Sequence, residues 1–212
     1  MFVAVDTTGD TAVSGIDVNN PVSHQPEHSD GSRYQCLFCG DPVAHNNDPD
    51  DELGYFSHSD EPCTGDGNVS SVHRLGQEMV AKTIFEILPT GSGSTRIELE
   101  RKIGSRSSFI IADVRVSEPI HLAVEVLYLS AGLDLHRRLR TLFEEGYAGM
   151  IVALTTGLAS PMRIEKHLKK IGDIHVGRFD PHRLDLLFGS IVSPGQVNLN
   201  SSSWDHLPRY LA

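Results

Sequence analysis

Residues 108–129 read SFIIADVRVSEPIHLAVEVLYL, and the fold prediction rests on this stretch. Two β-rich runs, 108–116 and 121–129, flank the turn-forming residues 117–120. Each run carries one acid among aliphatic side chains, Asp113 in the first and Glu125 in the second. A carboxylate inside an apolar strand is costly unless it is paired or bound to a metal ion. We therefore expect both acids to have partners.

The segments on either side of these strands indicate an α/β domain. Upstream, the pattern predicts a helix at 71–88, which begins at a pair of serines and ends before Pro89, and a strand at 96–103. Downstream, it predicts a helix at 133–147, a buried strand at 148–156, a helix and a short strand within 160–181, and a last helix at 182–192. Three antiparallel strands, a crossover helix and a parallel strand predict a mixed sheet flanked by helices.

The three cysteines of the chain all lie in a short Gly/Pro/Asp-rich block near the N-terminus. Cys36, Cys39, His58 and Cys63 follow the pattern C-x2-C-x18-H-x4-C. This spacing supplies four ligands for a closed, structural zinc site. The block holds few large apolar residues, so metal binding would supply folding energy that burial cannot. Free thiols without a metal remain the alternative, and His45 or His73 could replace His58.

Composition and charge limit the organisation and the partners of the chain. The 212 residues carry a net charge of −10, which indicates either that nucleic acid is not a partner or that only a local basic face binds it. We expect a flexible leader at 1–32, a zinc-ribbon-like module at 33–68, a main domain at 69–190 and a C-terminal extension at 191–212. No apolar run is long enough to span a membrane and no signal peptide is recognisable, so the expected location is the cytoplasm.

The two strand acids are also candidates for catalysis. Carboxylates on neighbouring strands can hold one or two Mg²⁺ or Mn²⁺ ions, which polarise a phosphodiester and activate a water molecule. Glu78, on the preceding helix, is a candidate third ligand. The alternative is that Asp113 and Glu125 face solvent on one side of an exposed sheet.

Five pieces of the sequence, taken in order, resemble the CoiA-like competence family. They are YQCLFCGDPV, YFSHS, SSVHRLGQEMVAK, IIADVRV and AVEVLYLS…HRRLRTLFEEGY, within residues 34–155. That family is similar to nucleases of the PD-(D/E)xK superfamily, with a restriction-endonuclease-like core and a zinc-ribbon-like N-terminal segment. The resemblance makes Asp113 and Glu125 metal-binding acids and places His73 at the start of the core helix.

The resemblance implies a metal-dependent DNA nuclease or DNA-processing protein, acting in DNA uptake or recombination with DNA or a protein of that process as its partner. One position departs from the pattern, because Leu127 stands where the family has Lys or Gln. Lys82 or Lys102 would have to replace that residue. The alternative function is a catalytically inactive adaptor that binds DNA or a protein and keeps the fold and the zinc site.

Two basic segments are candidates for DNA contact. The run at 136–140 supplies Arg137, Arg138 and Arg140, and a second run lies at 163–170. On a nuclease-like fold these side chains would contact phosphates. The alternative is that both runs are solvated helix faces.

Overall fold

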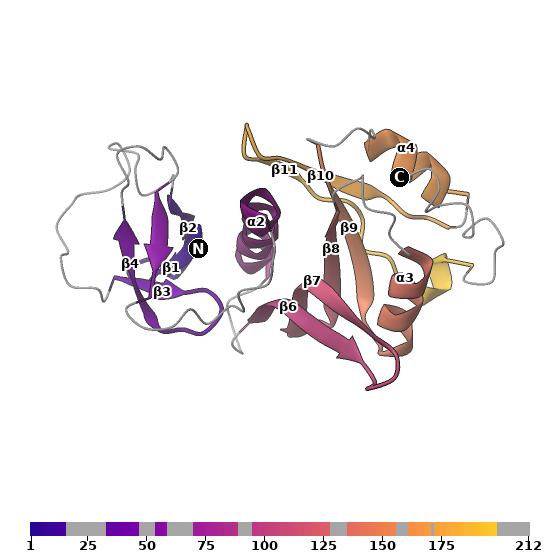
Figure 1. Cartoon of the computed structure of the whole chain (residues 1–212), viewed down its shortest axis with the longest axis horizontal. Coiled ribbons are helices and arrows are strands. Elements are labelled where there is room, and N and C mark those ends of the chain that lie inside the picture. Colours follow the sequence, from indigo (N-terminus) through magenta and orange to yellow (C-terminus); the bar gives the residue numbers. More distant parts are fainter. Residues whose placement is uncertain are drawn as a thin grey trace.

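The structure is a computed structural model with two β-sheets, one on each side of a central helix (Figure 1). It describes residues 1–15, 33–46, 54–58, 70–88, 95–127, 135–155, 161–170 and 172–198. Within these residues, no helix is both long enough and apolar enough to cross a membrane.

The smaller, N-terminal sheet has five antiparallel strands in the order β2-β1-β3-β4-β5. The strands are β1 (Val3–Asp6), β2 (Thr11–Ser14), β3 (Tyr34–Cys36), β4 (Pro42–Asn46) and β5 (Tyr55–Ser57). Their core is small and consists of Ala4, Val13, Cys36, Val43 and Phe56. With so few apolar residues, burial alone gives this sheet little stability.

The first fifteen residues correct the expected leader at 1–32. They form the hairpin β1–β2, and β1 pairs with β3 through Ala4 and Cys36. The alternating residues Val3 and Val5 were too few to indicate a strand, but β3 supplies the pairing partner that stabilises it. The rest of the expected leader lies outside the described residues.

Helix α2 (Ser71–Ile87) matches the predicted helix within one residue. Its N-cap is Ser70, whose side chain accepts a hydrogen bond from the backbone N–H of His73 at 3.3 Å, as N-cap serines commonly do. The helix lies between the two sheets (Figure 1). Its buried apolar residues pack on the larger sheet, and Glu78 contacts the N-terminal sheet.

The larger sheet has six strands in the order β11-β10-β9-β8-β7-β6. Its elements are β6 (Arg96–Gly104), β7 (Phe109–Glu118), β8 (Leu122–Leu127), α3 (Leu135–Glu144), β9 (Ala148–Leu154), α4 (Pro161–Leu168), β10 (Val176–Asp180), β11 (Asp185–Leu187) and the 3-10 turn η1 (Pro194–Gln196). Strands β6, β7 and β8 are antiparallel, whereas β8, β9 and β10 are parallel. The predicted sequence of three antiparallel strands, a helix and a parallel strand is therefore confirmed, as part of a mixed α/β fold.

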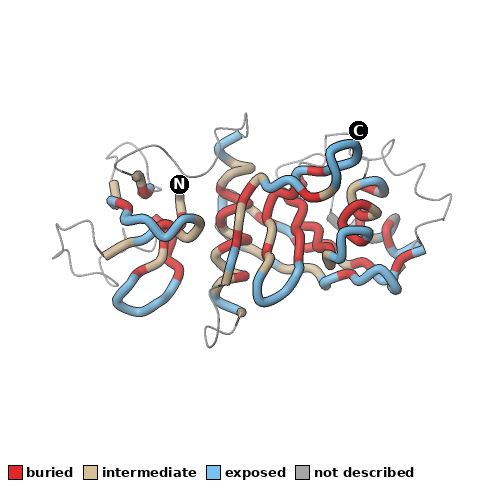
Figure 2. Tube along the Cα trace, turned by 90° about the horizontal axis from the view of Figure 1, so that it is seen from below, coloured by how far each residue is buried: buried red, intermediate tan, exposed pale blue. Residues whose placement is uncertain are grey.

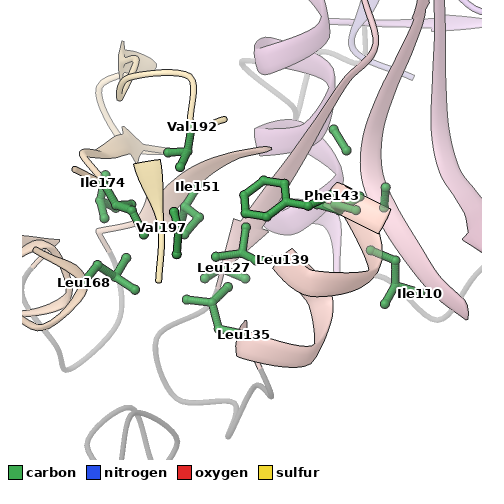
Figure 3. Packing of buried hydrophobic residues seen from close by; sticks show 14 of the residues in the cluster. Ile110, Leu127, Leu135, Leu139, Phe143, Ile151, Leu168, Ile174, Val192 and Val197 are labelled. Carbon is green, nitrogen blue, oxygen red and sulfur yellow. The ribbon is translucent and has the colours of Figure 1, made fainter. Parts of the chain in front are cut away.

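The two faces of this sheet bury separate hydrophobic clusters. One cluster lies under α2, and the other lies under α3 and α4. Figure 3 shows residues of the second cluster, where Leu135, Leu139 and Phe143 of α3 meet Ile151 of β9. Along the chain, buried segments concentrate in α2 and in the strands beside it (Figure 2).

Residues 182–192 do not form the predicted last helix. They continue through β11, which is antiparallel to β10. Leu184, Leu186 and Phe188 all pack on the cluster under α2, and this spacing of two is the period of a strand, not of a helix.

The expected boundary at 190 is also corrected. Val192 and Val197 are buried under α3 and α4, and they pair with Gly149 and Gly172. Residues 191–198 are therefore part of the domain, and the remainder of the expected extension lies outside the described residues.

Candidate functional site

The N-terminal sheet brings three potential metal ligands together. The ligand atoms of Cys36, Cys39 and His58 all lie within 4.8 Å of one another, and they form the one such group of three or more among the described residues. Cys36 ends β3, and His58 directly follows β5. The sulfur of Cys39 lies 3.3 Å from Nε2 of His58, close to the roughly 3.6 Å expected between such ligands on a tetrahedral zinc ion.

The loop between the two cysteines has the geometry of a metal-binding knuckle. Backbone N–H groups of Phe38 and Asp41 donate to the sulfurs of Cys36 and Cys39, at 3.3 Å and 3.5 Å. Gly40 has a φ of 79°, a conformation that glycine adopts without strain. N–H donors favour the thiolate form that metals bind. The three residues could thus hold a metal ion; Cys63, the predicted fourth ligand, lies outside the described residues.

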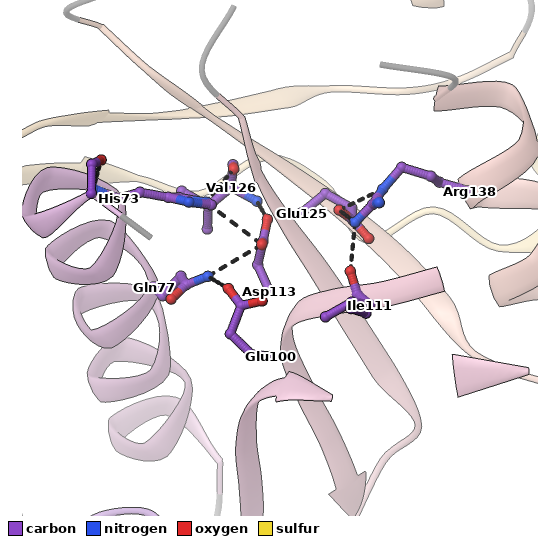
Figure 4. Close-up of polar contacts among 9 residues, drawn as sticks. His73, Gln77, Glu100, Ile111, Asp113, Glu125, Val126 and Arg138 are labelled. Atoms are coloured by element: carbon purple, nitrogen blue, oxygen red, sulfur yellow. Dashed lines mark hydrogen bonds and ion pairs between the residues drawn. The ribbon is translucent and has the colours of Figure 1, made fainter. Parts of the chain in front are cut away.

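Asp113 and Glu125, predicted to share a metal ion, lie against different helices on opposite sides of the sheet (Figure 4). Asp113 faces α2, where its carboxylate accepts from Gln77 at 3.2 Å and from the backbone N–H of Val126 at 2.6 Å. Glu125 faces α3 and accepts from Nε of Arg138 at 2.8 Å. The structure therefore does not bring the two side chains to a common point.

An irregularity in the β6–β7 ladder explains the position of Asp113. The ladder pairs Leu99 with Val114 and Arg101 with Ala112, but it does not pair Glu100 with Asp113. Glu100 has a positive φ of 51°. Ala112 packs on the α3 side whereas Val114 packs on the α2 side, although residues two apart in a regular strand share a face. At Asp113 the strand therefore loses its regular alternation, and the residues after it face the opposite side of the sheet from the one that the regular pattern would give.

Beside this irregularity, on the side of the sheet that faces α2, lies a polar cluster of His73, Gln77, Glu100 and Asp113 (Figure 4). The amide nitrogen of Gln77 contacts both carboxylates. Nε2 of His73 donates to the carbonyl of Val126 at 2.8 Å and lies 3.5 Å from Asp113. Burial alone would lower the pKa of His73, but Asp113, together with the carbonyl of Val126 and the charge of Glu100, raises that pKa overall.

Sequence reasoning identified His73 but missed Gln77 and Glu100. Gln77 follows His73 by one helical turn, and this spacing places both on the same face of α2. The spacing was the one feature of the sequence that could have predicted Gln77 beside His73. Glu100 lies in a strand with several exposed charges, and nothing in the sequence distinguishes it from them.

The α3 side holds a hydrogen-bonded pair, Glu125 and Arg138, that is almost closed to solvent. Glu125 is 0% exposed, and Arg138 also donates to the carbonyl of Ile111 at 2.6 Å. Burial, together with the charge of Asp113, raises the pKa of Glu125 to about 8, and Arg138 opposes this shift. Arg138, predicted to contact DNA, is therefore occupied inside the protein. Arg137 lies exposed on α3 and Arg140 is half-buried there.

Glu78 and the two candidate lysines do not reach either strand acid. Glu78 accepts hydrogen bonds from the backbone N–H groups of Phe2 and Val3, the latter at 3.1 Å, and burial raises its pKa. It therefore joins β1 to α2 and is not a third ligand beside Asp113.

Lys82 lies one turn after Glu78 and pairs with Glu86 at 2.7 Å. The Nζ atom of Lys102 lies 3.8 Å from the ring centre of Phe109. Leu127, at the position of the missing Lys or Gln, is 2% exposed and packs among the apolar residues under α3. None of these three side chains supplies the missing polar group.

Comparison with known proteins finds no matching family model, no similar curated protein and no similar solved structure.

Proposed function

We propose that the protein is a DNA-binding adaptor that does not cleave its ligand, built on a restriction-endonuclease-like core with a zinc-stabilised N-terminal module. The DNA-binding part follows the resemblance to the CoiA-like competence family, and the observation that carries the absence of cleavage is the separation of Asp113 and Glu125. Each carboxylate is held by protein donors on its own side of the sheet. Metal-dependent phosphodiester hydrolysis needs such acids to bind one or two ions beside the scissile bond.

Two further observations support an adaptor over an enzyme. Leu127 is buried among apolar side chains and has no group to orient water or to stabilise developing negative charge. Arg138 already holds Glu125, the buried carboxyl on its side of the sheet. The fold thus uses its buried polar groups for internal pairing.

We assign zinc to Cys36, Cys39 and His58, with Cys63 as the predicted fourth ligand. Two or three thiolates and one imidazole are a ligand set typical of structural zinc. The donor set fits because N–H groups already point at both described sulfurs. A four-ligand site of this kind leaves no open position for a substrate, so its role is to stabilise the sheet.

The test is a joint binding and cleavage assay. Labelled single- and double-stranded DNA are incubated with the full chain in Mg²⁺ or Mn²⁺, beside Asp113→Asn, a variant that keeps an oxygen acceptor for the N–H of Val126. We expect binding without cleavage in both proteins. Cleavage by the wild type that disappears in Asp113→Asn would overturn the proposal in favour of a nuclease. Absence of binding to either DNA would overturn the adaptor itself.

A further inference from the structure

The outer half of the β6–β7 hairpin differs in charge from the rest of the chain. Residues 101–112 read RKIGSRSSFIIA, with three cationic and no acidic side chains, in a chain of net charge −10. Arg101 is paired with Glu98 at 2.9 Å. Lys102 and Arg106 are exposed, and β6 is the edge strand of this sheet among the described residues.

The two faces of this hairpin have different surroundings. Ile103, Ile110 and Ala112 pack under α3. On the opposite face, Phe109 is 41% exposed and Ile111 is 45% exposed. An aromatic ring and an aliphatic side chain at such exposure, on neighbouring positions of one strand face, are not explained by the packing of the domain.

The register places a cation and an open aromatic ring together on the exposed face. Lys102 pairs with Ile111 and Gly104 pairs with Phe109. Gly104, opposite Phe109, has no side chain to place over the ring, so Lys102 is the residue of β6 that reaches it. A side chain there would also clash, since a Cβ would lie 2.4 Å from the carbonyl of Ser108. The Nζ atom of Lys102 lies over the Phe109 ring at 3.8 Å.

We propose that this face of the hairpin binds single-stranded nucleic acid: Lys102 leaves the Phe109 ring for a phosphate, a base stacks on the ring in its place, and Arg106, exposed between β6 and β7, contacts a neighbouring phosphate. An exposed aromatic ring beside cations is the arrangement on which unpaired bases stack. A base inside a duplex does not offer its face to such a ring, so the hairpin selects single strands. Charge complementarity favours a polyanion, because this hairpin is a basic element on an acidic protein.

This inference rests on the proposed function, which it narrows to a strand type and a surface. The assay measures fluorescence anisotropy of a labelled 20-nucleotide oligodeoxythymidine with the full chain, between 50 and 300 mM salt. Phe109→Leu keeps an apolar side chain but removes the aromatic face, and we expect affinity to fall about tenfold. The double variant Lys102→Gln/Arg106→Gln should reduce the slope of log affinity against log salt by about 1.4, which is about 0.7 for each cation.

Matched controls come from the opposite edge of the sheet. Leu187 on β11 is 56% exposed, and Arg183, before β11, has an 82% exposed side chain. Leu187→Ala and Arg183→Gln should bind as the wild type does. If the wild type binds DNA but the hairpin variants bind equally well, the hairpin assignment is overturned and the adaptor function stands. If the wild type binds no nucleic acid, both are overturned.

A competition arm separates nucleic acid from a charged membrane surface. Vesicles of anionic phosphatidylserine are added to the preformed complex, and neutral phosphatidylcholine vesicles serve as the control. We expect the oligonucleotide to stay bound. Displacement by the anionic vesicles alone, together with hairpin-dependent vesicle binding, would identify a membrane-binding face and overturn the inference.

Discussion

Replacing Glu125 with Gln distinguishes a neutral, buried partner of Arg138 from an ionised metal ligand. Burial and Asp113 raise the pKa of Glu125 to about 8, whereas in the unfolded chain it is about 4.3. Between these values the folded protein holds a proton that the unfolded chain has released. Stability from this group is therefore fully present below about pH 4.3 and falls as the pH rises to 8, and linkage gives a loss of about 2 kcal/mol between pH 6 and pH 8.

The assay is urea unfolding followed by far-UV circular dichroism at pH 6, 7 and 8. Gln cannot ionise, so Glu125→Gln should lose this part of the pH dependence, while His73 and other groups titrate equally in both proteins. Glu98→Gln is the matched control. Burial would raise the pKa of Glu98, but Arg115 outweighs this effect and lowers the pKa below its ordinary value of 4.5. Glu98 therefore does not titrate between pH 6 and pH 8. Equal pH dependence in wild type and Glu125→Gln would refute the reasoning, as would a dependence that Mg²⁺ abolishes.

Three further predictions concern contacts that hold separate parts of the fold together. Glu78→Ala leaves the N–H groups of Phe2 and Val3 at the start of β1 without their acceptor and should lower the free energy of unfolding by about 2 kcal/mol or more. Glu78→Gln, which keeps an acceptor oxygen, should lower it less, and equal values for the two variants in urea unfolding would contradict this. Cys36→Ser should remove about one zinc per chain, as measured by elemental analysis, and should lower the melting temperature. A chelator should lower the melting temperature of the wild type in the same way. Intact wild-type protein without zinc would disprove the assignment. A chain that ends at residue 190 loses the buried side chains of Val192 and Val197, and its free energy of unfolding should fall by about 3 kcal/mol or more. A chain that ends at residue 198 keeps both valines and should keep this stability. Equal melting temperatures of the two chains would contradict the corrected boundary.

Local patterns in the sequence were sufficient to predict most elements and the metal-ligand group. The period of α2 and its serine cap determine its bounds because both are local features. The C-x2-C spacing within a tight turn constrains two sulfurs directly, and His58 lies beside them because β4 and β5 pair next to β3. The strand β1 was missed because its stability depends on β3 and on Glu78, which are distant in sequence.

Long-range packing decided the elements that were predicted wrongly. Residues 182–192 contain enough leucine for a helix, but the alternation of Leu184, Leu186 and Phe188 meets the apolar surface under α2. Val192 and Val197 lie within a Gly/Ser/Pro-containing stretch that resembles a tail. Their burial depends on an apolar surface formed by α3, α4 and β9, and no local pattern indicates that surface.

The separation of the two acids follows from the register of the strands that carry them. β7 and β8 pair Val114 with Val124, so a regular ladder would place Asp113 directly opposite Glu125. Facing residues have Cβ atoms about 5 Å apart, and like charges there are destabilising. The chain turns over at Asp113, and its carboxylate binds the N–H of Val126, at the point where the β7–β8 pairing ends. The same two residues could share a metal ion only if the ladder became regular at Asp113. Cleavage that depends on Asp113 would therefore imply a different backbone conformation at that residue.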